Sequence, residues 1–226
     1  KQNLALCLFI TLVFLIGLLS DLKKISSVSL RFFLQCVIVL LFVNFVDIKI
    51  SYIRIDIFDQ WLNMPLVNII FVTFCLLVLV NGSNFIDGIN GLTIGYFLLI
   101  FFIIFFNFND FEYDKNLLEN LIIILLIILL LNFKGILYLG DSGSYTIGLF
   151  TGIFLIDFAF NNNSISPYFI IVLLWYPCFE LLFSIIRRFF KKLKTYSPDT
   201  THLHHLVYKK IKTYFKIKNN SISHFT

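Results

Sequence analysis

Charged side chains are scarce in this sequence. Lys, Arg, Asp and Glu make up 14% of the 226 residues, whereas apolar residues make up 59% and phenylalanine alone occurs 29 times. A water-soluble domain carries roughly a quarter charged residues, because it must cover its core with solvated side chains. So little polar surface excludes a soluble globular domain, and the long apolar runs indicate a protein that crosses a membrane several times.

Paired cysteines are also lacking. Cys7, Cys36, Cys75 and Cys178 each lie alone within an apolar run, with no C-x-x-C pair and no regular spacing. This pattern favours neither a disulfide framework nor a thiolate metal site. We interpret the four residues as small apolar packing side chains.

Seven apolar segments can cross a bilayer as helices, some with the help of tilt or local thinning of the membrane. The predicted spans are approximately 4–19, 32–50, 62–80, 88–106, 117–133, 145–160 and 167–186. The first resembles the apolar part of a signal peptide, but no small-residue cleavage site follows it. We therefore expect an all-α, polytopic membrane bundle over 1–186 and a basic cytoplasmic loop over 187–226.

Basic residues are distributed unequally among the connections between these spans. Fourteen of the 18 Lys and Arg residues lie in one set, formed by 20–31, 81–87, 132–144 and the tail from 187. By the positive-inside rule this set faces the cytoplasm. The basic tail could bind nucleic acid, but beside apolar spans it is better matched to anionic lipid headgroups or phosphorylated substrates, so no nucleic-acid partner is expected.

The same connections contain four polar motifs. These are S-D-L-K-K-I-S at 20–26 with Arg31 and Gln35 beyond it, N-G-S-N-F-I-D-G-I-N-G-L at 81–92, G-D-S-G-S-Y-T-I-G at 140–148, and S-P-D-T-T-H-L-H-H at 197–205. The positive-inside rule takes no account of the motifs. That all four fall on the same side of the membrane therefore independently supports one shared site.

Asn84, Asp87 and Asn90 recur at every third residue of the second motif. On a helix this spacing predicts that they share one face over two turns. Gly91 and Gly95 predict a close contact with a neighbouring helix. Helix capping alone would explain one Asn, but a carboxylate inside a span is expensive unless it is used, so we interpret Asp87 as functional.

Asp141 lies between Gly140 and Gly143 at the mouth of the next span. The glycines let backbone amides approach an anion, and the helix start adds a positive dipole end. An acidic residue would repel a phosphate there unless it held a bridging divalent cation, which is the usual arrangement for Mg²⁺. An ordinary Asp-Ser-Gly turn is the alternative.

Two further groups of polar residues lie near the end of the chain. His202, His204 and His205 suggest zinc, but the last two are adjacent and no Cys is near, so we interpret them as donors to a phosphate or a sugar hydroxyl, with a solvated loop as the alternative. Glu180 lies within the seventh predicted span. It either pairs with an arginine at the end of that span or belongs to the site.

Together the four motifs resemble those of the polyprenyl-phosphate N-acetylhexosamine-1-phosphate transferases, which are integral membrane enzymes of all-helical fold. That family shows an Asp-Asp pair, N-x-x-N-[FL]-x-D-G-[ILF]-[DN]-G-L, G-D-x-G-S-x-x-x-G and a cytoplasmic H-x-H-H loop, in this order. The S-P-D-x-x-H-L-H-H form is closer to the undecaprenyl-phosphate GlcNAc-1-phosphate branch, which initiates O-antigen and other surface glycans. The resemblance implies further spans before residue 1 and after the histidine loop.

The resemblance also implies a role for each motif residue. Asp141 would ligate Mg²⁺, or Mn²⁺ in its place, with Asn84 close to the ion. The catalytic set would be Asp21 beside the lipid phosphate, the nucleotide-sugar pocket residues Asp87 and Asn90, and the donor-contacting His202, His204 and His205. The remaining expected substrate-binding residues are Gly88, Ser144, Glu180, Arg187 and Arg188.

The implied reaction transfers an N-acetylhexosamine-1-phosphate from a UDP-sugar to undecaprenyl phosphate and releases UMP. It would take place at the cytoplasmic face of the bacterial inner membrane. The expected partners are the nucleotide sugar, the polyprenyl phosphate lipid and the membrane. A homodimer and the identity of the amino sugar are left open.

The sequence departs from the family pattern at Ser20, which stands where the first Asp of the acidic pair is expected. If that carboxylate were an indispensable base, activity would be impaired. A phosphate monoester is already largely ionised near neutral pH, so we expect that no base is needed. Asn90 replaces a commoner Asp, but Asn occurs there in some branches. Two alternatives stay open: an inactive lipid-binding scaffold, and an ion-coupled transporter, which predicts midplane polar residues and an internal repeat.

Overall fold

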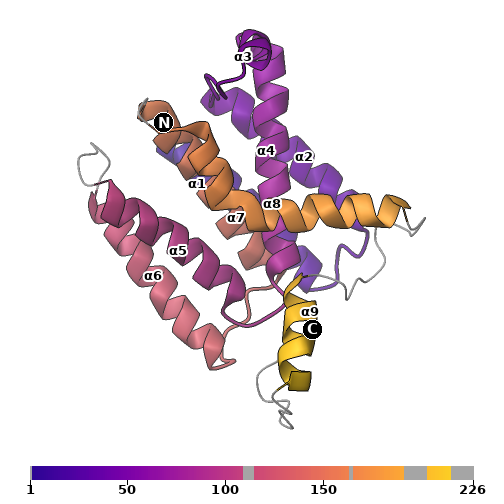
Figure 1. Ribbon diagram of the computed structural model, residues 1–226. Coiled ribbons are helices and arrows are strands. Elements are labelled where there is room, and N and C mark those ends of the chain that lie inside the picture. Colours follow the sequence, from indigo (N-terminus) through magenta and orange to yellow (C-terminus); the bar gives the residue numbers. More distant parts are fainter. Residues whose placement is uncertain (1, 109–114, 163–164, 191–202, 215–226) are drawn as a thin grey trace. The chain divides into compact units, whose positions relative to one another are not determined.

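The computed structural model describes residues 2–108, 115–162, 165–190 and 203–214 (Figure 1). Over these ranges the chain forms helices joined by turns, without a strand. The prediction of an all-helical bundle is confirmed. The chain divides into two compact units, Lys1–Phe85 with Gly140–Pro198, and Ile86–Leu139 with Asp199–Thr226. The predicted boundary between residues 186 and 187 is not tested by this division and stays a prediction.

Each unit is built from helices that are distant in sequence. The first unit contains α1 (Gln2–Asp21), α2 (Val28–Val46), α3 (Asp56–Leu62), α4 (Pro65–Ile86, whose last residue lies just beyond the unit), α7 (Gly140–Asn161) and α8 (Pro167–Phe190). The second contains α5 (Leu92–Asn107), α6 (Lys115–Phe133) and α9 (Leu203–Tyr214).

The predicted spans correspond to seven apolar helices. In the part of the chain that is described, six helices are long and apolar enough to cross a bilayer, namely α1, α2, α4, α6, α7 and α8. α5 is apolar but shorter. Several boundaries differ from expectation by four to six residues. α4 continues to Ile86 instead of ending near residue 80, α5 begins at Leu92 instead of residue 88, and α7 begins at Gly140 instead of residue 145. α2 lies four residues earlier than predicted at both ends, and α8 continues four residues beyond residue 186.

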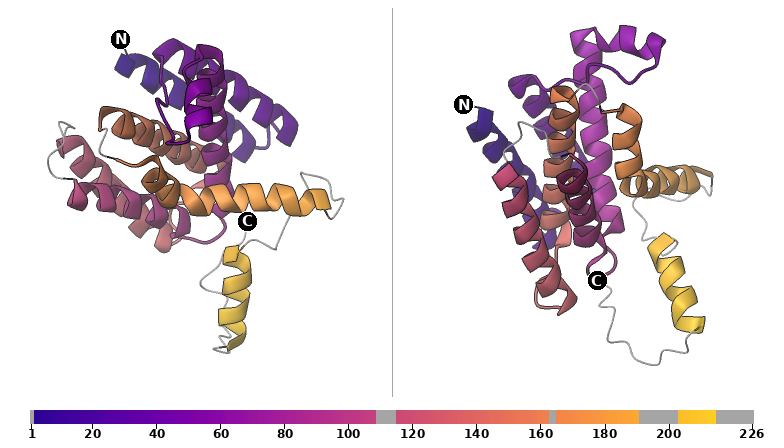
Figure 2. Two further views of the ribbon diagram at one scale, coloured as in Figure 1. Left: turned by 45° about the horizontal axis from the view of Figure 1, so that its top comes forward. Right: turned by 60° about the vertical axis from the view of Figure 1, so that its left-hand side comes forward.

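The core of the first unit lies between α1, α2, α4 and α7, which pack side by side (Figures 1 and 2). Val13, Phe42, Leu76 and Leu149 supply one side chain from each helix, and none is more than 1% exposed. Helices in a membrane associate through close packing, because lipid is as apolar as the side chains themselves. Gly17 permits such packing, since a Cβ atom there would lie 2.3 Å from a backbone atom of α7.

α8 changes direction along its length, and Pro177 lies inside it (Figure 2). Proline lacks an N–H group and clashes with the preceding turn, so it kinks a helix. The Pro177 carbonyl oxygen approaches α4 so closely that a Cβ atom on Gly82 would lie 2.4 Å from it. Beyond the bend, the Arg188 guanidinium lies over the ring of Phe85, 5.5 Å from its centroid.

In the second unit, α5 packs against α6. A Cβ atom on Gly91 would lie 2.3 Å from the Phe133 ring of α6, and one on Gly95 would lie 3.9 Å from Leu129 of the same helix. Both positions face α6, but only Gly91 approaches it closely; 3.9 Å at Gly95 is an ordinary contact, so the predicted close contact is confirmed at Gly91 and not at Gly95. The buried amide of Asn132 completes it, because its Oδ1 accepts from the Gly91 N–H at 2.5 Å.

Asn84, Asp87 and Asn90 do not share a helix face, so that prediction is wrong. α4 ends at Ile86, and residues 87–91 form a turn before α5. Gly91 closes this turn in the left-handed region, at φ +83°, which glycine adopts without steric cost. Of the three residues, only Asn84 therefore lies in α4. Asp87 and Asn90 lie in the turn and belong to the second unit.

Candidate active site

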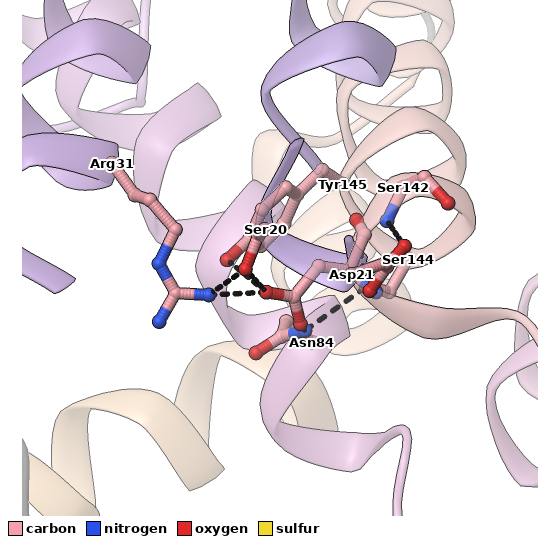
Figure 3. Close-up of polar contacts among 8 residues, drawn as sticks. Ser20, Asp21, Arg31, Asn84, Ser142, Ser144 and Tyr145 are labelled. Carbon is pink, nitrogen blue, oxygen red and sulfur yellow. Dashed lines mark hydrogen bonds and ion pairs between the residues drawn. The ribbon is translucent and has the colours of Figure 1, made fainter. Parts of the chain in front are cut away.

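Side chains from four helices of the first unit form a polar cluster around Asp141; Figure 3 labels its partners Ser20, Arg31 and Asn84. Its Oδ2 accepts a hydrogen bond from Ser20 Oγ at 2.5 Å and is ion-paired with Arg31, whose Nη1 also donates to Ser20. Its Oδ1 accepts from Asn84 Nδ2 at 2.6 Å. Because these residues lie at the end of α1, the start of α2 and the end of α4, the structure brings parts of three predicted motifs together.

Asp21 is held against the start of α7. Its Oδ1 accepts from the Asp141 backbone N–H at 2.9 Å, and its Oδ2 accepts from the Ser142 N–H at 3.0 Å. Gly140 makes room for this contact, since a Cβ atom there would lie 2.8 Å from Asp21 Oδ2. The helix start thus binds an anion, as its N–H groups and dipole predict, but the anion is a carboxylate of the same chain.

Hydroxyl groups of Ser83, Ser144 and Tyr145 form hydrogen bonds beside the Asp141 carboxylate. Ser83 and Ser144 are fully buried, and Ser83 Oγ donates to the Ser144 carbonyl oxygen at 2.6 Å, which ties α4 to α7. Ser144 Oγ accepts from Asn84 Nδ2 at 3.1 Å. Tyr145, 4% exposed, directs its hydroxyl at Asp141 Oδ2 from 3.4 Å. The Asp141 carboxylate is therefore fixed by donors on both oxygens.

The donor set limits the kind of metal ion that this cluster can hold. Over the described residues, no three His, Cys, Asp or Glu side chains gather as a metal site. Mg²⁺ usually takes only one or two protein carboxylates and fills its shell with waters and substrate phosphates. Asp141, with 22% of its side chain exposed, fits that arrangement, whereas Asn84 points its amide nitrogen at the carboxylate. The residues fit an ion that arrives with a phosphate.

The other expected site residues are placed less completely. Glu180 is 2% exposed within α8, and Arg187 donates to Ser184 Oγ at 3.3 Å. Asp87, Gly88 and Asn90 lie in the turn of the second unit. His202 and the side chains of His204 and His205 lie outside the part of the chain that the structure describes. The expected roles of all these residues stay predictions.

Three contributions went unrecognised in the sequence. Arg31 follows the first motif, where the sequence indicates no role for it, yet it makes the ion pair with Asp141. Tyr145 lies inside the third motif, one turn after that aspartate, and its helical spacing was a usable signal. Asn132 interrupts an apolar run just before Lys134, and a buried amide in such a run is expected to bond backbone groups.

The fold and this cluster define a polytopic helical membrane protein with a carboxylate- and amide-lined site at the ends of its spans. The chain belongs to glycosyl transferase family 4, whose model matches residues 3–159. That range contains α1 to α7 except for Gln2 at the start and the last two residues of α7, and it includes the Asp141 partners described above. The family membership predicted from the four motifs is confirmed.

Two bacterial relatives resemble the chain along most of its length. It is 28% identical to the undecaprenyl-phosphate alpha-N-acetylglucosaminyl 1-phosphate transferase of Thermotoga maritima. The matched 204 residues cover 90% of this chain and 61% of that protein. It is 23% identical over 205 residues to a probable undecaprenyl-phosphate N-acetylglucosaminyl 1-phosphate transferase of Bacillus subtilis, covering 86% of this chain and 55% of that protein. The chain thus spans about three fifths of the length of these relatives.

Proposed function

We propose that this protein transfers N-acetylhexosamine-1-phosphate from a UDP-sugar to undecaprenyl phosphate and so initiates a cell-surface glycan. The observation that carries the proposal is the convergence of Ser20, Asp21, Arg31 and Asn84 on Asp141, within the segment that matches the family. The names of the two relatives support the lipid acceptor and the type of group transferred.

The reaction balances without a dedicated base. An oxygen of the ionised lipid phosphate attacks the β-phosphorus of the donor. The bond between that phosphorus and the bridging oxygen breaks, UMP leaves with the oxygen, and a sugar-diphosphate-lipid remains. Ser20, in place of a carboxylate, is compatible with this route because the attacking phosphate needs no proton removed.

The site residues neutralise and orient charge. Both reactants are anionic, so cationic groups are needed to bring them together. The proposed Mg²⁺, with Mn²⁺ as an alternative, would be held by Asp141 and would neutralise and align the phosphates. Asn84 and Tyr145 fix the orientation of that carboxylate, and Arg31 supplies a positive charge beside it. The three histidines, Asp87 and Asn90 are proposed to bind the nucleotide sugar.

The lipid substrate also explains the position of the cluster. The phosphate of undecaprenyl phosphate lies at the membrane surface, so a site at the ends of α1, α4 and α7 can be reached by that headgroup while the tail stays in the bilayer. We place this end at the cytoplasmic face of the bacterial inner membrane, on the basis of the basic residues near residues 20–31 and after residue 186.

The test is release of UMP. Purified protein with undecaprenyl phosphate, Mg²⁺ and UDP-GlcNAc, or another UDP-N-acetylhexosamine, is expected to release UMP, and Asp141→Asn is expected to reduce this to background. Asp47→Asn is the matched control, since Asp47 is exposed at the end of α2, where it pairs with Lys49, and it should retain activity within about twofold. If no UDP-N-acetylhexosamine yields UMP, the scaffold interpretation is favoured instead.

A further inference from the structure

Arg31 and the proposed divalent cation compete for the same oxygen. Asp141 Oδ2 accepts from the Arg31 guanidinium and from Ser20, while Oδ1 accepts from Asn84. Mg²⁺ binds at about 2.0–2.1 Å from its oxygen ligands in strict octahedral geometry. Oδ2 already accepts from the guanidinium and from Ser20, so such an ion can bind this oxygen only if the guanidinium moves away.

The charges make simultaneous binding unfavourable. Only 19% of the Arg31 side chain and 22% of the Asp141 side chain are exposed, so solvent screens this pair incompletely. One carboxylate cannot compensate an arginine and a divalent ion at the same time. Asp21 also lies nearby, but its carboxylate is directed at the start of α7, where its two oxygens accept backbone N–H groups and interact with the positive end of that helix.

A pyrophosphate would remove this conflict. It brings the negative charge that the second cation needs, and it offers acceptors for the guanidinium. Arg31 is equipped to take them, since its Nε is buried and has no hydrogen-bond partner over the described residues. The planar guanidinium fork matches phosphate geometry, so Arg31 can leave the carboxylate for the incoming anion.

We propose that Arg31 is an exchangeable counter-cation of Asp141, which blocks the divalent ion until a pyrophosphate-bearing donor arrives with it. The inference rests on the proposed function and deepens it: the ion and the donor bind together, and the ion binds only weakly alone. Arg31 is thus a positioning residue. It pairs with the Asp141 carboxylate before the donor binds and with the donor pyrophosphate once the donor is bound.

The experiment measures Mn²⁺ binding to the purified protein by the loss of the free-ion electron paramagnetic resonance signal. Wild-type protein should bind Mn²⁺ weakly alone and at least about tenfold more tightly with saturating UDP, after correction for a UDP-only blank. Arg31→Gln, which keeps a donor but removes the charge, should bind Mn²⁺ about tenfold more tightly without UDP and gain less from its addition. Arg31→Lys keeps the charge and should behave as wild type within about threefold.

Two controls locate the effect. Lys49→Gln removes an exposed positive charge that pairs with Asp47, and it should leave Mn²⁺ binding unchanged. Asp141→Asn should abolish the tight binding in the Arg31→Gln background. The proposal is overturned if wild type binds Mn²⁺ equally well with and without UDP, a result that needs no variant to fold, or if Arg31→Gln leaves the affinity unaltered.

The outcome is independent of turnover. UMP release together with UDP-independent Mn²⁺ binding would refute the exchange and keep the transferase. Exchange without UMP release from any UDP-N-acetylhexosamine would refute the transferase and keep Arg31 as the counter-cation of a nucleotide-binding site.

Discussion

Gly17→Ala adds a single methyl group to α1 and is expected to disable the site without touching a functional side chain. Gly17 lies three and four residues before Ser20 and Asp21, on the same face of the helix. The new Cβ atom would lie 2.3 Å from Ser142 Cα, 2.5 Å from Ser142 N and 2.7 Å from the Asp141 carbonyl carbon. All three are backbone atoms, so no side chain can rotate away.

The size of the effect follows from these distances. Carbon atoms in contact lie about 3.5–4.0 Å apart, so α1 and α7 must separate by roughly 1 Å. Overpacking of this kind costs about 1–3 kcal/mol of stability. The separation also withdraws Asp21 and Ser20 from the start of α7, and a displacement of about 1 Å at a catalytic site can cost on the order of 100-fold in rate. We expect UMP release to fall by about that factor.

The assay compares Gly17→Ala with Gly95→Ala. A Cβ atom on Gly95 would lie 3.9 Å from Leu129, which is an ordinary contact, and alanine favours the helix by up to about 1 kcal/mol. Gly95→Ala should therefore retain activity within about twofold and should not lower the melting temperature. If Gly17→Ala keeps UMP release within about threefold of wild type, the close contact between α1 and α7 does not position the site, and the reasoning fails.

The remaining predictions concern three polar contacts. Ser20→Ala removes one donor from Asp141 but leaves its ion pair, which should cost roughly 1 kcal/mol and lower UMP release by less than about tenfold. A loss above about 100-fold would indicate that the hydroxyl acts on substrate. Asp21→Ala uncaps α7 and should cost about 1–2 kcal/mol, measured as a lower melting temperature; lost activity at an unchanged melting temperature would instead indicate contact with the lipid phosphate. Asn132→Leu leaves two backbone groups without a partner, so amide hydrogen exchange at residues 88–92 should accelerate by about tenfold, and unaltered exchange would contradict that role.

The spans could be predicted because hydropathy alone determines them, but their ends could not. The polar run from Asn81 to Asn84 suggested that α4 ended near residue 80. The helix continues because its polar side chains find partners within the protein: Asn81 donates to the Leu77 carbonyl oxygen of the same helix, and Ser83 donates to the Ser144 carbonyl oxygen of α7. A polar residue near a membrane surface therefore indicates a helix end only when no helical carbonyl satisfies it.

The convergence of Asp21 and Asp141 was predictable, whereas the form of their contact was not. Topology alone places the end of α1 and the start of α7 on one side of the membrane. That Asp21 bonds to the backbone of α7 depends on the space at Gly140, where a Cβ atom would lie 2.8 Å from Asp21 Oδ2, and no sequence pattern reports this space. The ion pair of Arg31 with Asp141 likewise spans 110 residues and leaves no local signature.

The capping of α7 by Asp21 fixes how far the two helices can slide past each other. Advancing α1 by one residue moves it about 1.5 Å along its axis, which would break both hydrogen bonds to the start of α7. The two helices must therefore adjust to a thicker or thinner bilayer together, by changing their shared tilt angle. The depth of the polar cluster below the lipid headgroups then varies with that inclination, so membrane thickness would set how easily the proposed lipid phosphate substrate reaches Asp141.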